Sequence, residues 1–368
     1  MDHHKSFMDR ALELAQRGGR AVAPNPMVGA VIVHDGKIIG EGYHHRFGEP
    51  HAEVHAIESV EQRELLLHST LYVTLEPCSH FGKTPPCADL IIASGIRHVV
   101  VGCRDPFPQV SGRGIAKLQN AGITVTENVR RDACTFVNRR FVTRHAERRP
   151  YIILKWAQTQ DGFIAPLPLQ RYAISGEESH RLVHAWRAEE MGILIGRRTA
   201  EIDDPLLTVR LVSGENPTRI VIDPSLSLNA ELNTFNAEAQ TIVINTQRSG
   251  SQGSVRRLLI PKDRWSTQEI CSALAHEGLT SVLVEGGAHT LATFIESGLW
   301  DEARIFTAPS LLKEGCRAPS ITGLSSSREF VGTDSLQHLY NPILMQRLGI
   351  SDFSILKTVA PLNHAVGE

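Results

Sequence analysis

The sequence predicts two successive α/β domains, and three observations lead to this fold class. A chain of 368 residues is too long for one ordinary hydrophobic core. Apolar runs with strand and helix periodicity alternate in both halves of the chain. Between the halves, the polar segment 145–150 ends in Pro150, and a new apolar run begins directly after it. We therefore expect one domain over residues 1–147, a second over residues 151–338, and a C-terminal extension of unknown role over residues 339–368.

The first half is expected to form a mixed sheet with helices on its faces. Asp35-Gly36, between two apolar runs, favours a hairpin turn. Pro86 suits the first turn of a helix, and Gly18-Gly19 ends the N-terminal helix. The expected helices begin near residues 5, 52 and 86. The expected strands are 28–33, 38–43, 70–75, 99–101 and 123–126.

The second half alternates in the same way and predicts a second α/β domain. The expected strands are 151–156, 192–195, 219–222, 241–245, 281–284 and 303–307. The expected helices are 177–190, 267–276 and one that begins at Ala288. The Ser/Gly-rich segment 248–254 is expected to be a surface loop, and residues 341–368 a strand pair or a loose tail.

Composition restricts the partners. The formal net charge is −2, with 42% hydrophobic and 21% charged residues, so neither nucleic acid nor a membrane is an expected partner. No apolar stretch near the N-terminus is long enough for a signal peptide or a membrane span, which favours a cytoplasmic protein with a small-molecule substrate.

Six cysteines in such a chain do not indicate a disulfide scaffold. The sequence leaves the oligomeric state open, and a dimer or a tetramer is compatible with it.

A candidate metal site lies in the first half. His51, Cys78 and Cys87 are three potential zinc ligands, which leave the fourth tetrahedral position open, as in catalytic sites. Zinc in such a site lowers the pKa of bound water to about 7. Glu53, two residues after the histidine, is the candidate proton shuttle and the expected catalytic residue. The order His-x-Glu, Pro-Cys and a second Cys is typical of zinc deaminases that act on nucleobases.

Two alternatives stay open. In the first, zinc only stabilises a binding module, because one of the other nearby histidines fills the fourth position; the candidates are His44, His45, His55 and His80. In the second, the chain is a nucleoside, tRNA or DNA-base deaminase with an unrelated appendage. Eight residues separate Cys78 from Cys87, where the common nucleoside-deaminase motif has two, and this spacing argues against the second alternative.

The motifs resemble a specific family. Segments 24–29, 51–53 and 76–87 are similar to the deaminase domain of the bifunctional deaminase–reductases of bacterial riboflavin biosynthesis. The resemblance implies a cytidine-deaminase-like, three-layer α/β/α domain. It also implies that Asn25 contacts the pyrimidine and that Lys83 holds the ribose phosphate of the substrate. Without the resemblance, Asn25 reads as a turn residue and Lys83 as a solvated loop lysine.

A candidate dinucleotide site lies in the second half, although no Gly-x-Gly-x-x-Gly follows its first strand. Segments 196–199 and 285–287 each follow an apolar strand and open an expected helix, where glycines let the backbone approach a phosphate. Arg197 and Arg198 would suit the 2′-phosphate of NADP. Taken alone, each glycine motif is also compatible with a simple tight turn.

These segments resemble the reductase domain of the same family, which implies a dihydrofolate-reductase-like α/β fold. Without the resemblance, Arg187 is compatible with an ion pair on a helix surface, and Asp203 with a helix cap or a turn. One departure from the family is Ala173, where a tryptophan often precedes the Ile-Ser pair. Together with Arg197, the residues expected to contact the cofactor are Gln158, Thr199, Asp203, Gly286 and Gly287, which lie in or beside the segments that carry the resemblance. The resemblance implies substrate contacts from Arg187, Leu207, Arg210 and Glu285.

The resemblance as a whole implies two sequential reactions on one metabolite. One zinc ion per chain would support hydrolytic deamination of 2,5-diamino-6-(5-phosphoribosylamino)pyrimidin-4(3H)-one. NADPH would then reduce the ribosyl group to give 5-amino-6-(5-phosphoribitylamino)uracil. The expected enzyme is therefore both a hydrolase and an oxidoreductase.

Overall fold

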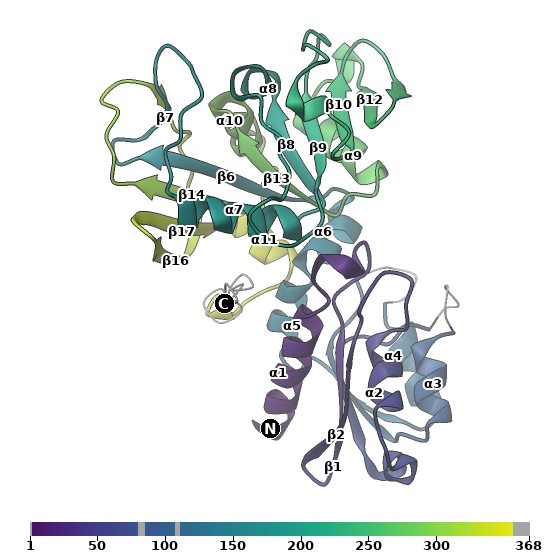
Figure 1. The fold of residues 1–368 in the computed structure, drawn as a ribbon. Helices are drawn as coiled ribbons and strands as arrows, with labels where there is room; N and C mark the ends of the chain where they lie inside the picture. The colour runs from purple at the N-terminus through teal and green to yellow at the C-terminus, as the bar shows by residue number, and fades with distance from the viewer. Residues whose placement is uncertain (1, 80–84, 107–110, 356–368) are drawn as a thin grey trace. The chain divides into compact units, whose positions relative to one another are not determined.

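The structure is a computed structural model that describes residues 2–79, 85–106 and 111–355. The described residues form two compact units, which Figure 1 shows as ribbons. Of the described residues, those up to Glu147 and residues 348–355 belong to the first unit, and Arg148–Arg347 form the second. Each unit has its own sheet and its own hydrophobic cores.

The first unit is built on a five-stranded sheet in the order β2-β1-β3-β4-β5. The hairpin β1–β2 is antiparallel, β1 pairs antiparallel with β3, and β3, β4 and β5 run parallel. The strands are β1 Gly29–His34, β2 Lys37–Tyr43, β3 Thr70–Leu75, β4 His98–Cys103 and β5 Thr124–Thr126. The helices are α1 Asp2–Gln16, α2 Ala52–Glu58, α3 Cys87–Ala93, α4 Arg113–Asn120, α5 Arg131–Val137 and α6 Arg139–Glu147, with short 3-10 turns at Gly19–Val22 and Arg63–His68.

Helices cover both faces of this sheet. Neighbouring residues of a strand point to opposite faces, so each strand can contribute to two cores. In β1, Ala30 and Ile32 belong to the core that contains residues of α2, α3 and α4. Val31 and Val33 belong to a second core, with residues of α1 and α5. The first unit is therefore a three-layer α/β/α domain, as the sequence predicts.

The second unit is built on a ten-stranded sheet in the order β11-β12-β10-β9-β8-β13-β6-β14-β17-β16. From β12 to β14 all neighbours are parallel, and the outer strands at both edges pair antiparallel. The long strands of the parallel part are β6 Tyr151–Thr159, β8 Gly192–Gly196, β9 Thr218–Ile222, β10 Thr241–Asn245, β12 Val255–Leu259, β13 Ser281–Gly286 and β14 Glu302–Ala308. The remaining strands are β11 Gly250–Gln252, β16 Leu324–Val331 and β17 Asp334–Tyr340, and a separate pair, β7 Phe163–Ala165 and β15 Cys316–Arg317.

Helices also cover both faces of the large sheet. The helices are α7 Glu177–Glu189, α8 Arg197–Asp203, α9 Thr267–His276, α10 Ala288–Glu296 and α11 Pro342–Arg347, with 3-10 turns at Asn233–Phe235 and Lys262–Arg264. Residues of α9 and α10 share one core with alternate residues of the central strands. Ala200 of α8 belongs to the smaller core that contains Ile193 and Ile195 of β8. On α7, the ring of Trp186 stacks on Phe306 of β14, with 5.4 Å between centroids.

Two expectations for the second half were wrong in part. Segment 248–254 is not only a loop: Gly250–Gln252 forms β11, which pairs antiparallel with β12 and closes one edge of the sheet. Residues 342–347, expected in a strand pair or loose tail, form helix α11. Its Leu344 and Met345 are buried, so apolar burial stabilises this helix.

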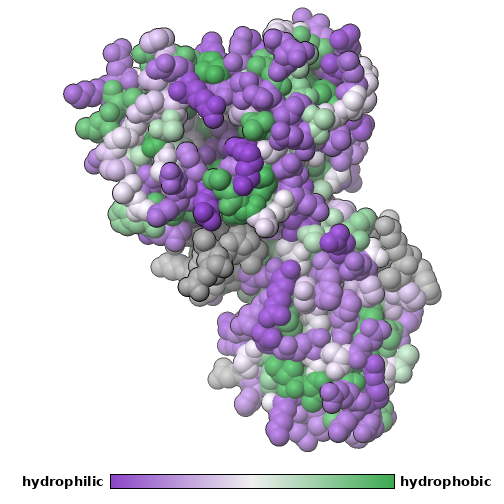
Figure 2. All heavy atoms as spheres, in the orientation of Figure 1, coloured by the Kyte–Doolittle hydropathy of each residue, from purple (hydrophilic) through white to green (hydrophobic). Residues whose placement is uncertain are grey.

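Membrane-crossing helices are absent from the part of the chain that the structure describes: none is both long and apolar enough. On the face shown in Figure 2, hydrophobic residues lie in small groups separated by hydrophilic ones.

Candidate active sites

The expected zinc ligands of the first unit come together at the carboxyl end of β3. His51 directly precedes α2, Cys78 lies three residues after β3, and Cys87 is the first residue of α3. Their ligand atoms all lie within 4.8 Å of one another. Nδ1 of His51 is 3.2 Å from Sγ of Cys87 and 3.7 Å from Sγ of Cys78. Spacings of this size allow one ion to be coordinated by all three atoms.

The local backbone favours the thiolate form of one cysteine. The backbone N–H of Cys87 donates to Sγ of Cys78 at 3.2 Å. Hydrogen bonds from Cys87 and His51 hold the pKa of the Cys78 thiol well below its usual range, although burial opposes this effect. Because zinc binds the thiolate rather than the thiol, this environment suits a metal ligand.

Glu53 lies in the first turn of α2 and is 3% exposed. Burial is the main reason that the pKa of its carboxyl rises to about 7, and the neighbouring Cys78 thiolate adds to the increase. A carboxyl in this position, two residues from His51, is adjacent to the metal-ligand group without being one of its members. This arrangement suits proton transfer near neutral pH.

The described histidines that could compete for the fourth position make other contacts. Nδ1 of His44 is 3.1 Å from the carbonyl oxygen of Pro50. His45 stacks on His55, with ring centroids 4.2 Å apart. None of the three belongs to the metal-ligand group among the described residues. His80 lies outside the described residues.

Asn25 lies in the same unit, beside His44. Its Nδ2 is 3.3 Å from Nε2 of His44, whose ring is packed edge-on against His51. The following segment is held by Asn138, a buried residue that accepts from the backbone N–H of Met27 at 2.8 Å and donates to its carbonyl oxygen at 2.9 Å. Asn25 is thus fixed near the metal-ligand group. Lys83, expected to hold the ribose phosphate, lies outside the described residues.

Glu76 belongs to the sequence motif of this site, but its structural role was not predicted from the sequence. Its buried carboxylate accepts four backbone hydrogen bonds, from Gly112 and Gly114 at 2.9 Å and from Asp105 and Ile115 at 3.3 Å. These bonds join the end of β3, two residues before Cys78, to the N-terminus of α4. A carboxylate with this many N–H donors is strongly fixed in place.

The second unit has a cavity of about 820 Å³ along the carboxyl edge of its parallel strands. This volume is typical of ligand-binding cavities. Of the residues implied to contact the cofactor, five line the cavity: Arg197, Thr199, Asp203, Gly286 and Gly287. Gln158 is not among the lining residues; its side chain accepts from Nε1 of Trp156 at 2.8 Å, and Trp156 does line the cavity.

Glycines allow two elements to approach closely at the centre of this cavity. A Cβ atom on Gly196 would lie 2.4 Å from Oγ1 of Thr290, and one on Gly287 would lie 3.0 Å from Oγ1 of Thr199. Gly286 has a φ of 124°, a value that favours glycine. Close packing and backbone conformation therefore favour glycine at the ends of β8 and β13, and glycine is also the residue that lets a backbone approach a phosphate.

A buried charged cluster forms one end of the cavity. Arg187 of α7 donates from Nε and one terminal nitrogen to the two carboxylate oxygens of Glu285, each at 2.8 Å. Nζ of Lys155 is 4.0 Å from the same carboxylate. Burial alone would raise the pKa of Glu285, but Arg187 and Lys155 outweigh it and hold the pKa at about 2. Arg187 is thus not a surface residue, since its side chain is 11% exposed, and it is not among the residues that line the cavity.

The other two residues implied to contact substrate belong to the segment 207–210. Leu207 is buried in the core beside β8. The backbone N–H of Arg210 donates to Nδ1 of His184 at 2.9 Å, and its guanidinium donates to Oγ1 of Thr208 at 2.8 Å. Neither Leu207 nor Arg210 lines the cavity, although Arg187 also donates to the carbonyl oxygen of Thr208 at 3.3 Å.

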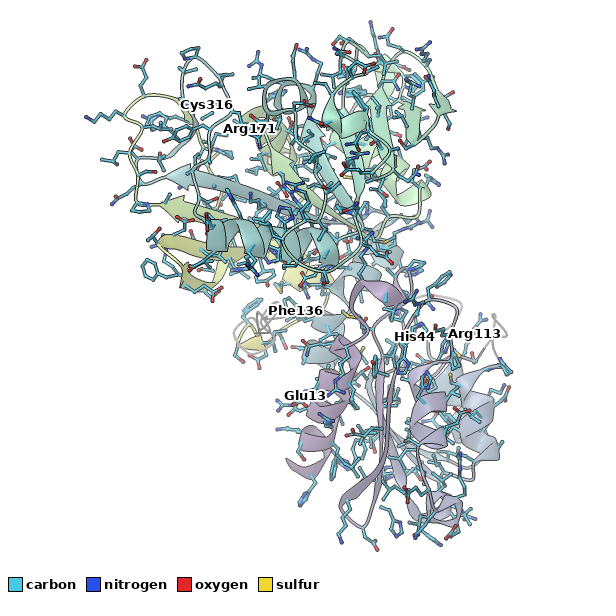
Figure 3. All side chains as sticks on the ribbon, viewed as in Figure 1. Glu13, His44, Arg113, Phe136, Arg171 and Cys316 are labelled. Atoms are coloured by element: carbon cyan, nitrogen blue, oxygen red, sulfur yellow. The ribbon has the colours of Figure 1, made fainter. Side chains whose placement is uncertain are left out.

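Ala173, the departure from the family pattern, lines the cavity together with Tyr172 and Cys316. Figure 3 shows Arg171 and Cys316 on the same side of β6. Ala173 therefore contributes only a methyl group to this part of the cavity wall.

The folds and sites define a class of protein: a bifunctional enzyme with a zinc-type deaminase unit followed by a reductase unit. The cytidine and deoxycytidylate deaminase zinc-binding region matches residues 1–103, and the RibD C-terminal domain matches residues 150–338. The chain is 42% identical to the riboflavin biosynthesis protein RibD of Aquifex aeolicus, over 84% of this chain and 88% of that protein. It is 38% identical to RibD of Escherichia coli, over 90% of this chain and 98% of that protein.

Solved structures agree with these relatives. A diaminohydroxyphosphoribosylaminopyrimidine deaminase/5-amino-6-(5-phosphoribosylamino)uracil reductase of Thermotoga maritima superimposes with a TM-score of 0.84 at 37% identity, covering 92% of this chain and 99% of that one. RibD of Acinetobacter baumannii gives a TM-score of 0.84 at 31% identity over the same shares of each chain. The chain belongs to the RibD family of bifunctional deaminase–reductases of riboflavin biosynthesis. The predicted fold class and the predicted type of enzyme are thus confirmed, and the two domains imply zinc and a nicotinamide cofactor.

Proposed function

We propose that this chain deaminates 2,5-diamino-6-(5-phosphoribosylamino)pyrimidin-4(3H)-one and then reduces the ribosyl group to give 5-amino-6-(5-phosphoribitylamino)uracil. The observation that supports the proposal most is the pairing of two sites in one chain: the His51, Cys78, Cys87 group in the first unit and the cavity beside Glu285 in the second. We place both reactions in the cytoplasm.

In the first unit, one histidine and two cysteines are a donor set that fits one zinc ion per chain. Zinc supplies the Lewis acidity that activates water, and NADPH supplies the hydride of the second reaction. Glu53 would take a proton from the attacking water and return it to the pyrimidine ring nitrogen and the departing amine. Asn25 would orient the pyrimidine, with its own amide held by His44. Lys83 would bind the ribose phosphate.

In the second unit, the cavity and its glycine turns fit a dinucleotide. Thr199 and Asp203 would line the nicotinamide end, with Gln158 supporting that end through Trp156. Gly286 and Gly287 would carry the pyrophosphate on their backbone. Arg197, whose pair with Glu201 is largely exposed, would bind the 2′-phosphate, which favours NADPH over NADH.

The substrate would occupy the charged end of the same cavity. Glu285 would accept hydrogen bonds from the ribose hydroxyls, since Arg187 keeps it ionised. The guanidinium groups of Arg187 and Arg210 would attract the substrate phosphate, and the buried side chain of Leu207 would anchor the segment that carries Arg210. The chain's role is to position the ribosyl carbon and to exclude water, while the cofactor carries the redox chemistry.

One assay tests the proposal. The purified zinc-loaded protein is incubated with the diaminopyrimidinone phosphate, with and without NADPH, while ammonia and absorbance at 340 nm are followed. We expect ammonia release in both reactions and loss of absorbance at 340 nm only where NADPH and substrate are present together. Absence of ammonia release, or NADPH oxidation that does not depend on substrate, would contradict it.

A further inference from the structure

The cavity of the second unit extends well beyond the charged cluster. Along the sheet the strand order is β6-β13-β8-β9, and neighbouring strands are about 4.8 Å apart. From Lys155 on β6 to the end of β9 the cavity therefore spans three strand spacings, about 14 Å. At this far end the lining residues change from charged to apolar: Ile222, Pro224 and Trp265.

Trp265 differs from the other tryptophans of the chain. The chain has four tryptophans, and Trp156, Trp186 and Trp300 are each at most 5% exposed. Trp265 is half-buried: it packs against the core of the second unit and also lines the cavity. One part of the indole is therefore supported by the core, while another part is accessible from the cavity.

The backbone around Trp265 is fixed on both sides. Its N–H donates to the carbonyl oxygen of Lys262 at 3.3 Å, at the end of the 3-10 turn Lys262–Arg264. The next residue, Ser266, caps α9, since its Oγ accepts from the N–H of Glu269 at 3.2 Å. An aromatic side chain on such a support loses little conformational entropy when a ligand binds.

Pro224 is fixed in a similar way. Its carbonyl oxygen accepts from the backbone N–H and from Oγ1 of Thr246, each at 3.0 Å. Gly196 at the end of β8 pairs in register with Ile222 at the end of β9. Arg197 therefore follows β8 directly beside the strand that leads to Pro224. The apolar end of the cavity and the arginines proposed for the 2′-phosphate are thus adjacent.

From this juxtaposition we propose that the indole of Trp265 is the stacking surface for the adenine ring of the dinucleotide. The inference deepens the proposed function, because it rests on use of NADPH by the second unit. The reactive end of the cofactor must lie near the charged cluster, which leaves the adenosine at the end of β9. There, a flat aromatic surface lies next to cationic side chains, and adenosine 2′-phosphate offers a flat ring next to an anion. Stacking of a base on an aromatic side chain is favourable without requiring specific hydrogen bonds.

The test uses 2′,5′-ADP, which carries the adenine and the 2′-phosphate but no nicotinamide. Its Kd is measured by titration calorimetry for the full-length wild type and for Trp265→Ala, Trp265→Leu and Trp265→Phe. We expect Trp265→Ala and Trp265→Leu to weaken binding about tenfold or more, and Trp265→Phe to stay within about threefold of the wild type. Phe330→Ala is the matched control, because Phe330 is 78% exposed and does not line the cavity; it should leave the Kd unchanged.

Steady-state kinetics give an independent readout. A contact remote from the reacting carbon binds ground state and transition state equally, so Trp265→Leu should raise the KM for NADPH with kcat unchanged. If Trp265→Ala does not fold, the Kd values of Trp265→Leu and Trp265→Phe decide whether the ring matters. Both variants keep an apolar side chain, and only Trp265→Phe keeps an aromatic ring.

Two negative results are distinguishable. The inference alone is overturned if the wild type oxidises NADPH while 2′,5′-ADP fails to bind or binds Trp265→Leu as tightly as the wild type. If the wild type binds neither 2′,5′-ADP nor NADPH, the proposed reductase function fails and the inference fails with it.

Discussion

Replacing Glu285 by glutamine removes a negative charge from between two buried cations, Arg187 and Lys155. The side chains of all three residues are at most 13% exposed, so water screens this cluster weakly. The pKa of Glu285 falls from an ordinary value of 4.5 to about 2. At 1.36 kcal/mol per pKa unit, this lowering corresponds to about 3 kcal/mol in favour of the ionised folded form. Removing one partner of a buried ion pair typically costs about 3–5 kcal/mol, a range whose lower end matches this value.

The pH dependence follows from the direction of the shift. A carboxyl whose pKa is lower in the folded state contributes its full stability above the unfolded pKa, and loses it as the pH falls through the folded pKa. The wild type should therefore lose about 3 kcal/mol of unfolding free energy between pH 4.5 and pH 2 from this group. Glu285→Gln should be less stable by about that amount at pH 7, and the difference should shrink below pH 4.5.

The assay uses a feature of the sequence. All four tryptophans lie in Arg148–Arg347, so urea unfolding followed by tryptophan fluorescence reports on the second unit alone. Glu201→Gln is the control, because Glu201 is 60% exposed in its pair with Arg197, and such pairs contribute at most about 1 kcal/mol. If Glu285→Gln destabilises the unit no more than Glu201→Gln, or if the difference persists unchanged at pH 3, the assigned ion pair is wrong.

Three further predictions concern the two sites. Cys78→Ser and Cys87→Ser should lose zinc and ammonia release, since a serine hydroxyl is a poor replacement for a thiolate, while reduction of pre-deaminated substrate persists; metal analysis and both assays check this. The wild type should prefer NADPH over NADH by at least about tenfold, roughly 1.4 kcal/mol. Arg197→Ala should reduce this preference, mainly by raising the KM for NADPH. Equal use of both cofactors by the wild type would contradict the prediction. Glu76→Gln should weaken the four backbone hydrogen bonds beside Cys78, at a cost of about 1–3 kcal/mol, and speed zinc loss to a chromogenic chelator; an unchanged rate would show that Glu76 does not support the site.

Elements with strong local patterns could be predicted from the sequence. Strand Thr70–Leu75 and helix Thr267–His276 have the predicted bounds, because apolar periodicity and turn residues define them locally. Strand Leu324–Val331 carries three serines and two charged residues, and it is stabilised as a strand by its pairing with Asp334–Tyr340. Segment 248–254 has the composition of a loop, yet β11 forms there because β12 offers a free edge. Such pairings are tertiary effects that outweigh local propensity.

The same distinction applies to the sites. His51, Cys78 and Cys87 form a motif that identifies them in the sequence, and the structure brings them together. The contacts of Glu76 and Asn138 have no local signature, because their partners lie up to 39 and 111 residues away. In the second unit, the sequence pointed to Glu285 but not to its bidentate pair with a helix more than 90 residues earlier. Hydrogen-bond partners of this kind depend on the fold and become visible only in three dimensions.

The most direct test of two independent chemistries in one chain is the substitution Glu53→Gln. Glutamine keeps the size of the side chain but cannot accept and return a proton, and general acid–base groups contribute typically about 10²- to 10⁴-fold. With the full-length variant, zinc content, ammonia release and oxidation of NADPH by pre-deaminated substrate are measured on one preparation. We predict zinc near one per chain, deamination reduced at least about 100-fold, and reduction unchanged. Loss of zinc would make Glu53 a ligand or a structural support, and full deaminase activity would remove it from the mechanism; either result would contradict the role proposed for it.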